Sequence, residues 1–269
     1  MHASILLVSA LGASAVVAAP TWPSFNYDAA KPDGLETVSE YFNMLAQKVG
    51  AGKFMSAAPV CDMSKASMPV APAPMDPPSP GLTLKHVAIG RGTQNYTCDL
   101  ANATATPQLV GAVATLFNAS CVASSYPDLL NILPKLALQF NLTAGEDARM
   151  GPTDLSISGK HFFTNITTPF FNLDTDQYQI GEASCTKKNQ TNPPTDAPTG
   201  QQGEAAVAWL RLTTLNGSTG DLQEVYRVQT AGGSPPATCQ GAQSAFEVQY
   251  SAQYVPNPPF HLEPSSTDY

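Results

Sequence analysis

The sequence predicts a mainly β protein: an antiparallel β-sandwich or open barrel with a few short helices and an N-terminal helical arm. The clearest support comes from residues 246–254, where apolar and polar residues alternate strictly. This period of two is typical of a strand with one buried face and one wet face. Two turn clusters rich in Gly, Asn and Pro, at 216–221 and 230–236, divide the region from Ala206 to Val255 into three candidate strands.

The first of these strands, Ala206–Leu212, is apolar on both faces. Such a run fits a strand that is covered on both sides, and a short buried helix is the alternative. The second strand is expected to break near Gly232 and Gly233, which two prolines follow. Glycine permits a positive φ there, and proline lacks the N–H that a β-ladder needs.

The N-terminal region predicts a signal peptide followed by a helical arm. Residues 1–18 contain a short apolar core that ends in small residues. The core is too short to span a bilayer as a helix, and a buried N-terminal helix is the alternative. We expect the arm over 19–65, with an amphipathic helix at Gly34–Val49. Residues 66–80 contain six prolines and predict a stiff, extended linker.

The β-rich domain is expected at 81–255, and a disordered tail at 256–269. Pro107–Phe117 fits either a helix or a buried strand, and we interpret it as a short helix. Tyr126–Phe140 predicts a helix that starts near Pro127 and is kinked or broken at Pro134. The span 186–204 predicts a long surface loop. Further strand candidates are Leu82–Gly90, Gly92–Cys98, Leu155–Ser158, Lys160–Thr167 and Tyr178–Ala183.

Charge is sparse: 13% of residues are charged, and the net charge is −8. A nucleic-acid partner would require a basic face, so we do not expect one. Seven Asn-x-Ser/Thr sequons follow the signal peptide and predict N-glycosylation, which supplies solubility. These sequons are Asn95, Asn102, Asn118, Asn141, Asn165, Asn189 and Asn216.

The sequon at Asn95 also orients its strand. If this asparagine faces water, its neighbours at 93 and 97 share the outward face, while Gln94, Tyr96 and Cys98 point inward.

The cysteines predict a disulfide-bonded protein of an oxidising compartment. Two disulfides and one odd thiol are expected, and the spacing leaves open which residues pair. No Cys-x-x-Cys pair occurs, so a zinc site is not supported. The five candidates are Cys61, Cys98, Cys121, Cys185 and Cys239.

Several motifs carry a family resemblance. Trp-Leu-Arg-Leu starts at Trp209, Tyr-Arg-Val-Gln-Thr-Ala-Gly-Gly at Tyr226, and Val-Gln-Tyr-Ser-Ala-Gln-Tyr at Val248. Together with Gly90–Cys98 and Gly159–Phe163, they make residues 82–254 resemble the family called domain of unknown function 3455. The resemblance implies no settled activity, although fungal members often carry the label malate dehydrogenase.

A dehydrogenase would need a dinucleotide site, and Gly90-Arg91-Gly92 matches half of that fingerprint. The third glycine is absent, and the next residues continue as a strand rather than as the helix that would hold a pyrophosphate. We therefore interpret the motif as a β-turn, expect no cofactor, and do not expect malate dehydrogenase activity.

Two histidines, His86 and His161, lie on predicted strands. His161 is the candidate catalytic residue, because histidine can act as acid or base near neutral pH. A hydrogen-bonded core histidine is the alternative. Arg227 lies among apolar residues and needs an anion there. We expect a salt bridge to an acidic residue (Glu182, Glu224 or Asp221), and a ligand anion is the alternative.

Aromatic residues of the C-terminal strands are candidates for ligand binding. Trp209 and Tyr226, with Tyr250 and Tyr254, could stack on a sugar, although strand residues of this kind usually belong to the core.

The sequence thus predicts a secreted, non-enzymatic binding protein outside the cell or in the cell wall. Its expected partner is a carbohydrate or a cell-wall component, with no membrane anchor. Neither Gly-x-Ser-x-Gly nor His-Glu-x-x-His occurs, and no metal site is expected. The alternative is an extracellular hydrolase or lyase that uses His161 and a nearby carboxylate.

Overall fold

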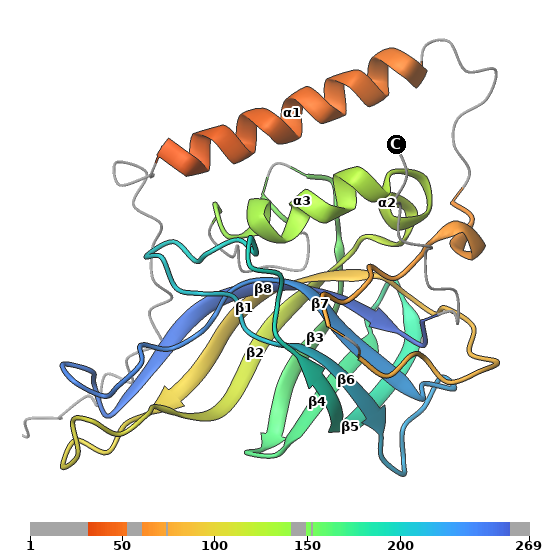
Figure 1. The fold of residues 1–269 in the computed structure, drawn as a ribbon. Helices are drawn as coiled ribbons and strands as arrows, with labels where there is room; N and C mark the ends of the chain where they lie inside the picture. The colour runs from red at the N-terminus through yellow and green to blue at the C-terminus, as the bar shows by residue number, and fades with distance from the viewer. Residues whose placement is uncertain (1–31, 53–60, 74, 141–148, 152, 259–269) are drawn as a thin grey trace, which may run out of the picture.

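The computed structural model describes residues 32–52, 61–73, 75–140, 149–151 and 153–258. This part of the chain forms an eight-stranded antiparallel barrel with helices on its outside (Figure 1). Each strand pairs with the next along the chain, and β8 pairs with β1. The predicted mainly β class is confirmed, and the sheet is a closed barrel.

The strands follow one another as a simple meander. They are β1 (Ala88–Thr97), β2 (Gln108–Asn118), β3 (Ile157–Asn165), β4 (Thr168–Asp174), β5 (Gln179–Thr191), β6 (Trp209–Thr214), β7 (Glu224–Gly232) and β8 (Ala245–Pro256). β1 pairs with β8 over its whole length, from Ala88 opposite Tyr254 to Thr97 opposite Ala245. The closure leaves no strand of the barrel as a free edge.

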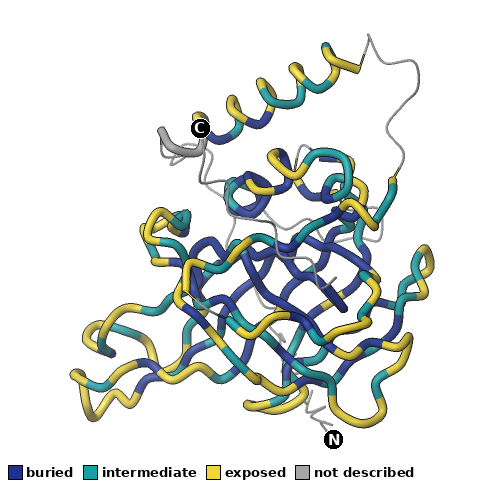
Figure 2. Tube along the Cα trace, turned by 45° about the vertical axis from the view of Figure 1, so that its right-hand side comes forward, coloured by how far each residue is buried: buried dark blue, intermediate teal, exposed yellow. Residues whose placement is uncertain are grey.

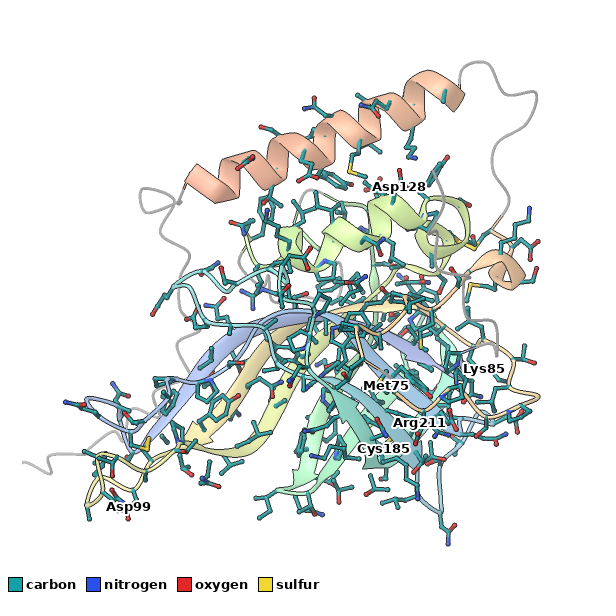
Figure 3. All side chains as sticks on the ribbon, viewed as in Figure 1. Met75, Lys85, Asp99, Asp128, Cys185 and Arg211 are labelled. Atoms are coloured by element: carbon teal, nitrogen blue, oxygen red, sulfur yellow. A yellow bond between two sulfur atoms is a disulfide. The ribbon has the colours of Figure 1, made fainter. Side chains whose placement is uncertain are left out.

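One end of the barrel interior is packed with side chains. Residues at the ends of the even strands and the starts of the odd ones meet there, because neighbouring strands are antiparallel. Leu116, Leu173 and Val225 are buried within this packing. Cys185 lies in the same cluster, fully buried (Figure 3). The side chains at this packed end close one of the two openings of the barrel.

Gly90 allows the ring of Tyr254 to pack across the interior. A Cβ atom at Gly90 would lie 2.4 Å from Cε2 of Tyr254 and 3.1 Å from a methyl carbon of Leu116. Real Cβ atoms essentially never lie within 3.0 Å of another atom, so the first of these contacts would force the Tyr254 ring to move. The glycine thus has a packing function in β1 and does not mark a nucleotide-binding turn.

Three helices cover one outer side of the barrel. They are α1 (Pro32–Gly52), α2 (Ser120–Ser125) and α3 (Pro127–Ala137), with a short 3-10 turn, η2, at Met63–Lys65. α3 lies against β1, β7 and β8, and α1 crosses above α3 as the outermost element (Figure 1). Lys48 of α1 forms a 2.6 Å ion pair with Asp128 of α3.

A second core lies between these helices and the barrel wall. The wall contributes Ile89, Trp209 and Val255, and α3 contributes Leu133 and Leu136, all fully or almost fully buried. The burial view shows the same layering, with a buried wall beneath α3 and an exposed upper face on α1 (Figure 2). The wall is therefore buried on both faces in this region.

The effect of the covering helices is clearest on the outward face of β8. Its alternation predicts one wet face, but Ser251 and Gln253 are only 0% and 1% exposed. The prediction is wrong for these two residues, because α3 packs over polar residues as well as apolar ones, whereas Glu247 on the same face is exposed. The hydroxyl of Ser251 donates to the carbonyl of Gly90 at 2.8 Å.

Arg91 joins α3 to the wall. Its Nε donates to the carbonyl of Ala137, the last residue of α3, at 3.0 Å, and Nη2 donates to the side chain of Gln249. A cation at a helix C-terminus satisfies carbonyls that lack intrahelical partners and complements the helix dipole. Burial lowers the pKa of Arg91 to about 10, so the side chain is still charged at neutral pH.

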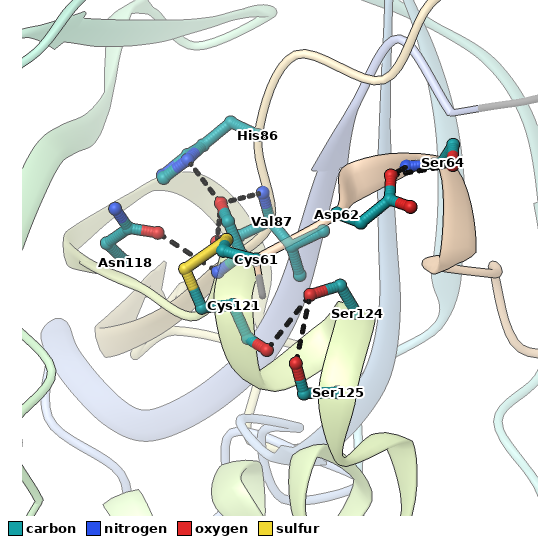
Figure 4. The surroundings of a disulfide bond; sticks show 10 residues. Cys61, Asp62, Ser64, His86, Val87, Asn118, Cys121, Ser124 and Ser125 are labelled. Carbon is teal, nitrogen blue, oxygen red and sulfur yellow. Dashed lines mark hydrogen bonds between the residues drawn. A yellow bond between two sulfur atoms is a disulfide. The ribbon is translucent and has the colours of Figure 1, made fainter. Parts of the chain in front are cut away.

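Two disulfides are present, and the pairing that the sequence left open is now assigned. Cys61–Cys121 ties the segment before the barrel to α2 (Figure 4). Cys98–Cys239 joins the end of β1 to the connection between β7 and β8. Cys185 is the free cysteine, and burial raises the pKa of its thiol to about 12.

The proline-rich segment before the barrel lies against β6 and β7. Its Ser79 hydroxyl donates to Glu224 at 2.6 Å, and the backbone carbonyl of Asp76 accepts from the Tyr226 hydroxyl at 2.8 Å. Arg211 forms ion pairs with Glu224 at 2.5 Å and with Asp76 at 3.4 Å (Figure 3).

Three sequence interpretations are corrected here. Pro107–Phe117 is not a helix, because Gln108–Asn118 forms β2, hydrogen-bonded to β1 and β3. Leu82–Gly90 and Gly92–Cys98 are not two strands around a turn, because β1 runs unbroken through Gly90-Arg91-Gly92. α3 continues through Pro134, so the expected break into two short helices is wrong.

The predicted surface loop and the predicted tail both begin later in the structure than the sequence indicated. β5 extends to Thr191, so the span 186–204 begins as a strand. β8 includes Pro256, and the Asn257 side chain accepts hydrogen bonds from the backbone of Gln223 and Glu224. Residues 1–31, which hold the expected signal peptide, and 259–269 lie outside the described residues.

We expect Gly90→Ala to destabilise the fold by about 1–3 kcal/mol, because the added methyl overpacks a buried aromatic ring. Urea unfolding followed by circular dichroism measures the effect. The matched control is Gly50→Ala in α1, where nothing lies within 4 Å of the new methyl. That change should raise stability by up to about 1 kcal/mol. Equal stability of Gly90→Ala and the wild type would contradict the packing role.

Candidate functional site: the cavity in the barrel

A cavity of about 530 Å³ occupies the end of the barrel opposite the packed end. It lies where β1, β3 and β5 finish and where β2, β4 and β6 begin. Successive side chains of a strand point to opposite faces of the sheet, so every second residue of these strands points into the barrel. Its apolar lining includes Tyr96, Leu109, Phe163, Pro169, Phe171, Val207, Leu210, Leu212 and Tyr254.

The floor of the cavity is formed by aromatic rings. The His161 imidazole stacks on Phe171, with ring centroids 4.3 Å apart and 13° between the planes. Tyr254 lies against both rings and bonds the hydroxyl of Tyr250 at 2.8 Å. Below them comes the packed end of the barrel. The cavity is thus a pocket with one closed end.

The mouth carries exposed apolar and polar residues. Ile166, in the hairpin between β3 and β4, is 70% exposed, and Leu109 is 47% exposed. Lys187 and Gln190 of β5 also line the cavity, and the Lys187 amine donates to the Gln190 amide oxygen at 3.0 Å. These two residues were missed as site residues because the sequence predicts a surface loop over 186–204. In the structure both belong to β5.

His161 is part of the cavity wall and only 3% exposed. Its Nδ1 lies 2.9 Å from the carbonyl oxygen of Phe170, so Nδ1 carries the proton and Nε2 is the acceptor. Burial, together with the nearby charge of Arg227, lowers the pKa of His161 to about 4. The ring is therefore neutral at pH 7.

The nearby carboxylate that a His161-dependent hydrolase or lyase needs is not among the residues that line the cavity. A neutral imidazole with so low a pKa is also a poor base at neutral pH. The position of His161 fits a packed aromatic ring with one buried hydrogen bond.

Arg227 also faces the cavity, but without the predicted ion pair. Glu224, one of the three expected partners, binds Arg211 instead. Asp221 lies 3.6 Å from the amine of Lys85 at the other end of the barrel. Among the described residues, no carboxylate lies within ion-pair distance of Arg227. The salt-bridge expectation is therefore wrong.

Gln94 and Tyr96 point into the cavity, as the orientation inferred from Asn95 predicted. The Tyr96 hydroxyl donates to the carbonyl of Gly233 at 2.8 Å. Gly233 has a φ of +97°, in the region that favours glycine, and a Cβ there would collide with Tyr250. The Gly-Gly run thus turns the chain beside the cavity.

The other candidate residues lie outside the barrel interior. Trp209 and Tyr226 are buried in the core under the helices, at 1% and 0% exposure. They cannot present a sugar-binding face there. His86 is buried between the hydroxyls of Ser120 and Ser158, at 3.0 Å and 2.8 Å, near the Cys61–Cys121 disulfide (Figure 4).

The described residues hold no group of three or more His, Cys, Asp or Glu side chains arranged to bind a metal ion. In the same part of the chain, none of the helices has the length and apolar character needed to cross a membrane.

The fold and the site together define a closed antiparallel barrel with a blind, mainly apolar internal pocket. Residues 78–256 match the family model described as "Protein of unknown function (DUF3455)", which is more than half of the chain. The chain therefore belongs to this family. No curated protein and no solved structure matches it.

We expect stability to fall as the pH is lowered from about 6.5 toward 4. Burial lowers the pKa of His86 and of His161 to about 4. Each ring is neutral in the folded state but takes up a proton in the unfolded state across this window, so acid favours unfolding. The loss is on the order of 3 kcal/mol for each histidine.

Urea unfolding at several pH values between 4 and 7.5 measures this dependence. In His161→Gln the slope should be about half as steep, because one of the two titrating groups is gone. A free energy of unfolding that stays constant across this range would contradict the assignment.

Proposed function

We propose that this protein is a non-enzymatic binding protein that holds one small, mainly apolar molecule inside its barrel. The observation that carries the proposal is the blind cavity of about 530 Å³ lined by aromatic and aliphatic side chains. Eight-stranded barrels are wide enough to hold one small ligand. Ligand pockets typically have volumes of roughly 300–1,000 Å³ and a few polar groups in an apolar lining.

The contents of the cavity favour binding over catalysis. Among the described lining residues there is no acidic side chain beside His161, and the imidazole is held by Phe170 and Phe171. The polar side chains that line the cavity are therefore suited to orient a bound ligand rather than to catalyse a reaction. The burial of Trp209 and Tyr226 also favours a small molecule in the barrel over a carbohydrate on the surface.

We also infer that the protein is secreted and N-glycosylated. Two disulfides support an oxidising compartment, in agreement with the apolar N-terminal segment of residues 1–18. Asn102, Asn165 and Asn216 are exposed, so each can carry a glycan without any rearrangement. Asn165 lies beside Ile166 at the cavity mouth, where a glycan would shield an exposed apolar residue.

The neutral fluorescent probe N-phenyl-1-naphthylamine should bind the folded protein with increased emission, because the cavity is apolar. Leu210→Trp should weaken this binding at least tenfold. Leu210 faces the cavity, and the larger indole occupies space that the probe needs. Fluorescence titration at pH 7 gives the dissociation constants.

The matched control for the probe is Leu215→Trp. Leu215 is 42% exposed and follows β6 at the opposite end of the barrel, so this variant should bind like the wild type. Equal weakening in both variants, or no binding to the wild type, would contradict a ligand site in the barrel.

Expression in a eukaryotic host should yield the protein in the medium without residues 1–18. Enzymatic removal of N-glycans should lower the intact mass and convert the glycosylated Asn102, Asn165 and Asn216 to Asp in peptide maps. Asn192 is exposed but is followed by Pro193-Pro194 and forms no sequon, so it should remain Asn. Secreted material whose mass does not change would sink the glycosylation proposal.

A further inference from the structure

Within the part of the chain that the structure describes, Arg227 is a buried cation that has no carboxylate partner and is only partly hydrogen-bonded. It lies on β7 opposite Leu210 and Tyr254, faces the cavity, and is 8% exposed. Nη2 donates to the backbone carbonyl of Ala208 at 2.9 Å. Its Nε is buried and has no hydrogen-bond partner among the described residues.

A buried guanidinium needs an anionic partner or hydrogen bonds to all parts of the group, because moving a charge out of water is costly unless the charge is compensated. Arg91 is compensated in the second way, by three oxygen acceptors. Arg211, nearby in sequence to Arg227, shows the first arrangement, with Glu224 and Ser79.

The titratable side chains near Arg227 include His161, Tyr96, Tyr250 and Tyr254, none of which is negatively charged at neutral pH. No carboxylate of the described residues forms an ion pair with Arg227, so its positive charge faces the cavity without an anionic partner.

Gln94 adds a second unused donor to the same wall. Its Nε2 is buried without a partner, and the residue is 1% exposed. Gln94 and Arg227 both line the cavity and lie on β1 and β7, the two strands that flank β8, so they belong to the same side of the pocket. At the mouth, Lys187 is a further cation.

We propose that the ligand of the cavity is a small, largely apolar carboxylic acid whose carboxylate binds Arg227 and Gln94. This inference rests on the proposed function, since it requires a ligand inside the barrel. The guanidinium matches a carboxylate in geometry and charge. The apolar body of the acid then packs against Phe171, Leu212 and Leu210.

A carboxylate fits the site better than a phosphate does. Arg227 is the only cation among the described lining residues that is buried, since Lys187 lies exposed at the mouth. One buried cation balances one negative charge. A dianionic phosphate would leave a charge uncompensated beside aromatic and aliphatic walls, which is costly.

The test compares acids with amides of the same shape. Decanoic acid and decanamide form an aliphatic pair, and 2-naphthoic acid and 2-naphthamide form an aromatic pair. Each compound is titrated at pH 7 against the bound N-phenyl-1-naphthylamine. At least one acid should bind the wild type about 30-fold more tightly than its amide, because only the acid pairs the buried charge.

Arg227→Met removes the charge and keeps most of the side-chain volume, so the preference for the acid should disappear while the amide binds as before. Arg227→Lys should retain part of the preference. The matched control is Arg149→Met, at an exposed arginine, which should leave both affinities unchanged. Circular dichroism and thermal unfolding show whether each variant is folded.

The outcomes separate the two proposals. If neither the probe nor any amide or acid binds the wild type, the proposed binding function fails. If the neutral compounds bind but neither acid is preferred, only the carboxylate assignment is overturned, and this comparison needs no variant. A preference that survives in folded Arg227→Met, or tighter binding of phenyl phosphate than of either acid, also overturns it.

Discussion

Hydrogen bonds between β1 and β8 join the first strand of the sheet to the last, and the inside of the protein exists because of this closure. A closed sheet has an interior face and an exterior face along every strand, and successive side chains alternate between them. The interior of a barrel with eight strands is narrow enough to be packed at one end. At the other end, the inward side chains line the cavity without filling it.

The outer face of the same strands is unevenly covered. On the side of β1, β7 and β8, α3 and α1 form a second core, which buries polar residues such as Arg91 and Ser251 together with Trp209 and Val255. The Cys61–Cys121 disulfide holds residue 61 against α2, and the contacts of Asp76 and Ser79 hold residues 76–79 against β7. The side of the cavity formed by β1, β7 and β8 is therefore supported from outside, which suits a preformed binding site.

Much of the local structure was predictable because it depends on local chemistry. The alternation from Phe246 to Tyr254 is that of a strand, and Pro127 starts α3 where a proline at the first helical position is favoured. Pro107–Phe117 was misinterpreted because a mostly apolar run has no distinguishing period. Its partners, β1 and β3, decided that it is a strand. The sequence did not predict the cavity, although it did predict the inward orientation of two of its lining residues, Gln94 and Tyr96.

By itself, the sequence determined the mainly β class, the family, and the alternation that turns alternate side chains of each strand inward. These features arise from residue patterns within a few positions. Only the tertiary structure decided which cysteines pair, where Arg227 lies relative to the acidic residues, and that the sheet closes around a cavity. Each of these depends on contacts between residues that are distant in the chain: Cys98 meets Cys239, and Glu224 pairs with Arg211, not with Arg227. Spacing along the sequence does not encode such distances, because they are set by how the whole sheet closes.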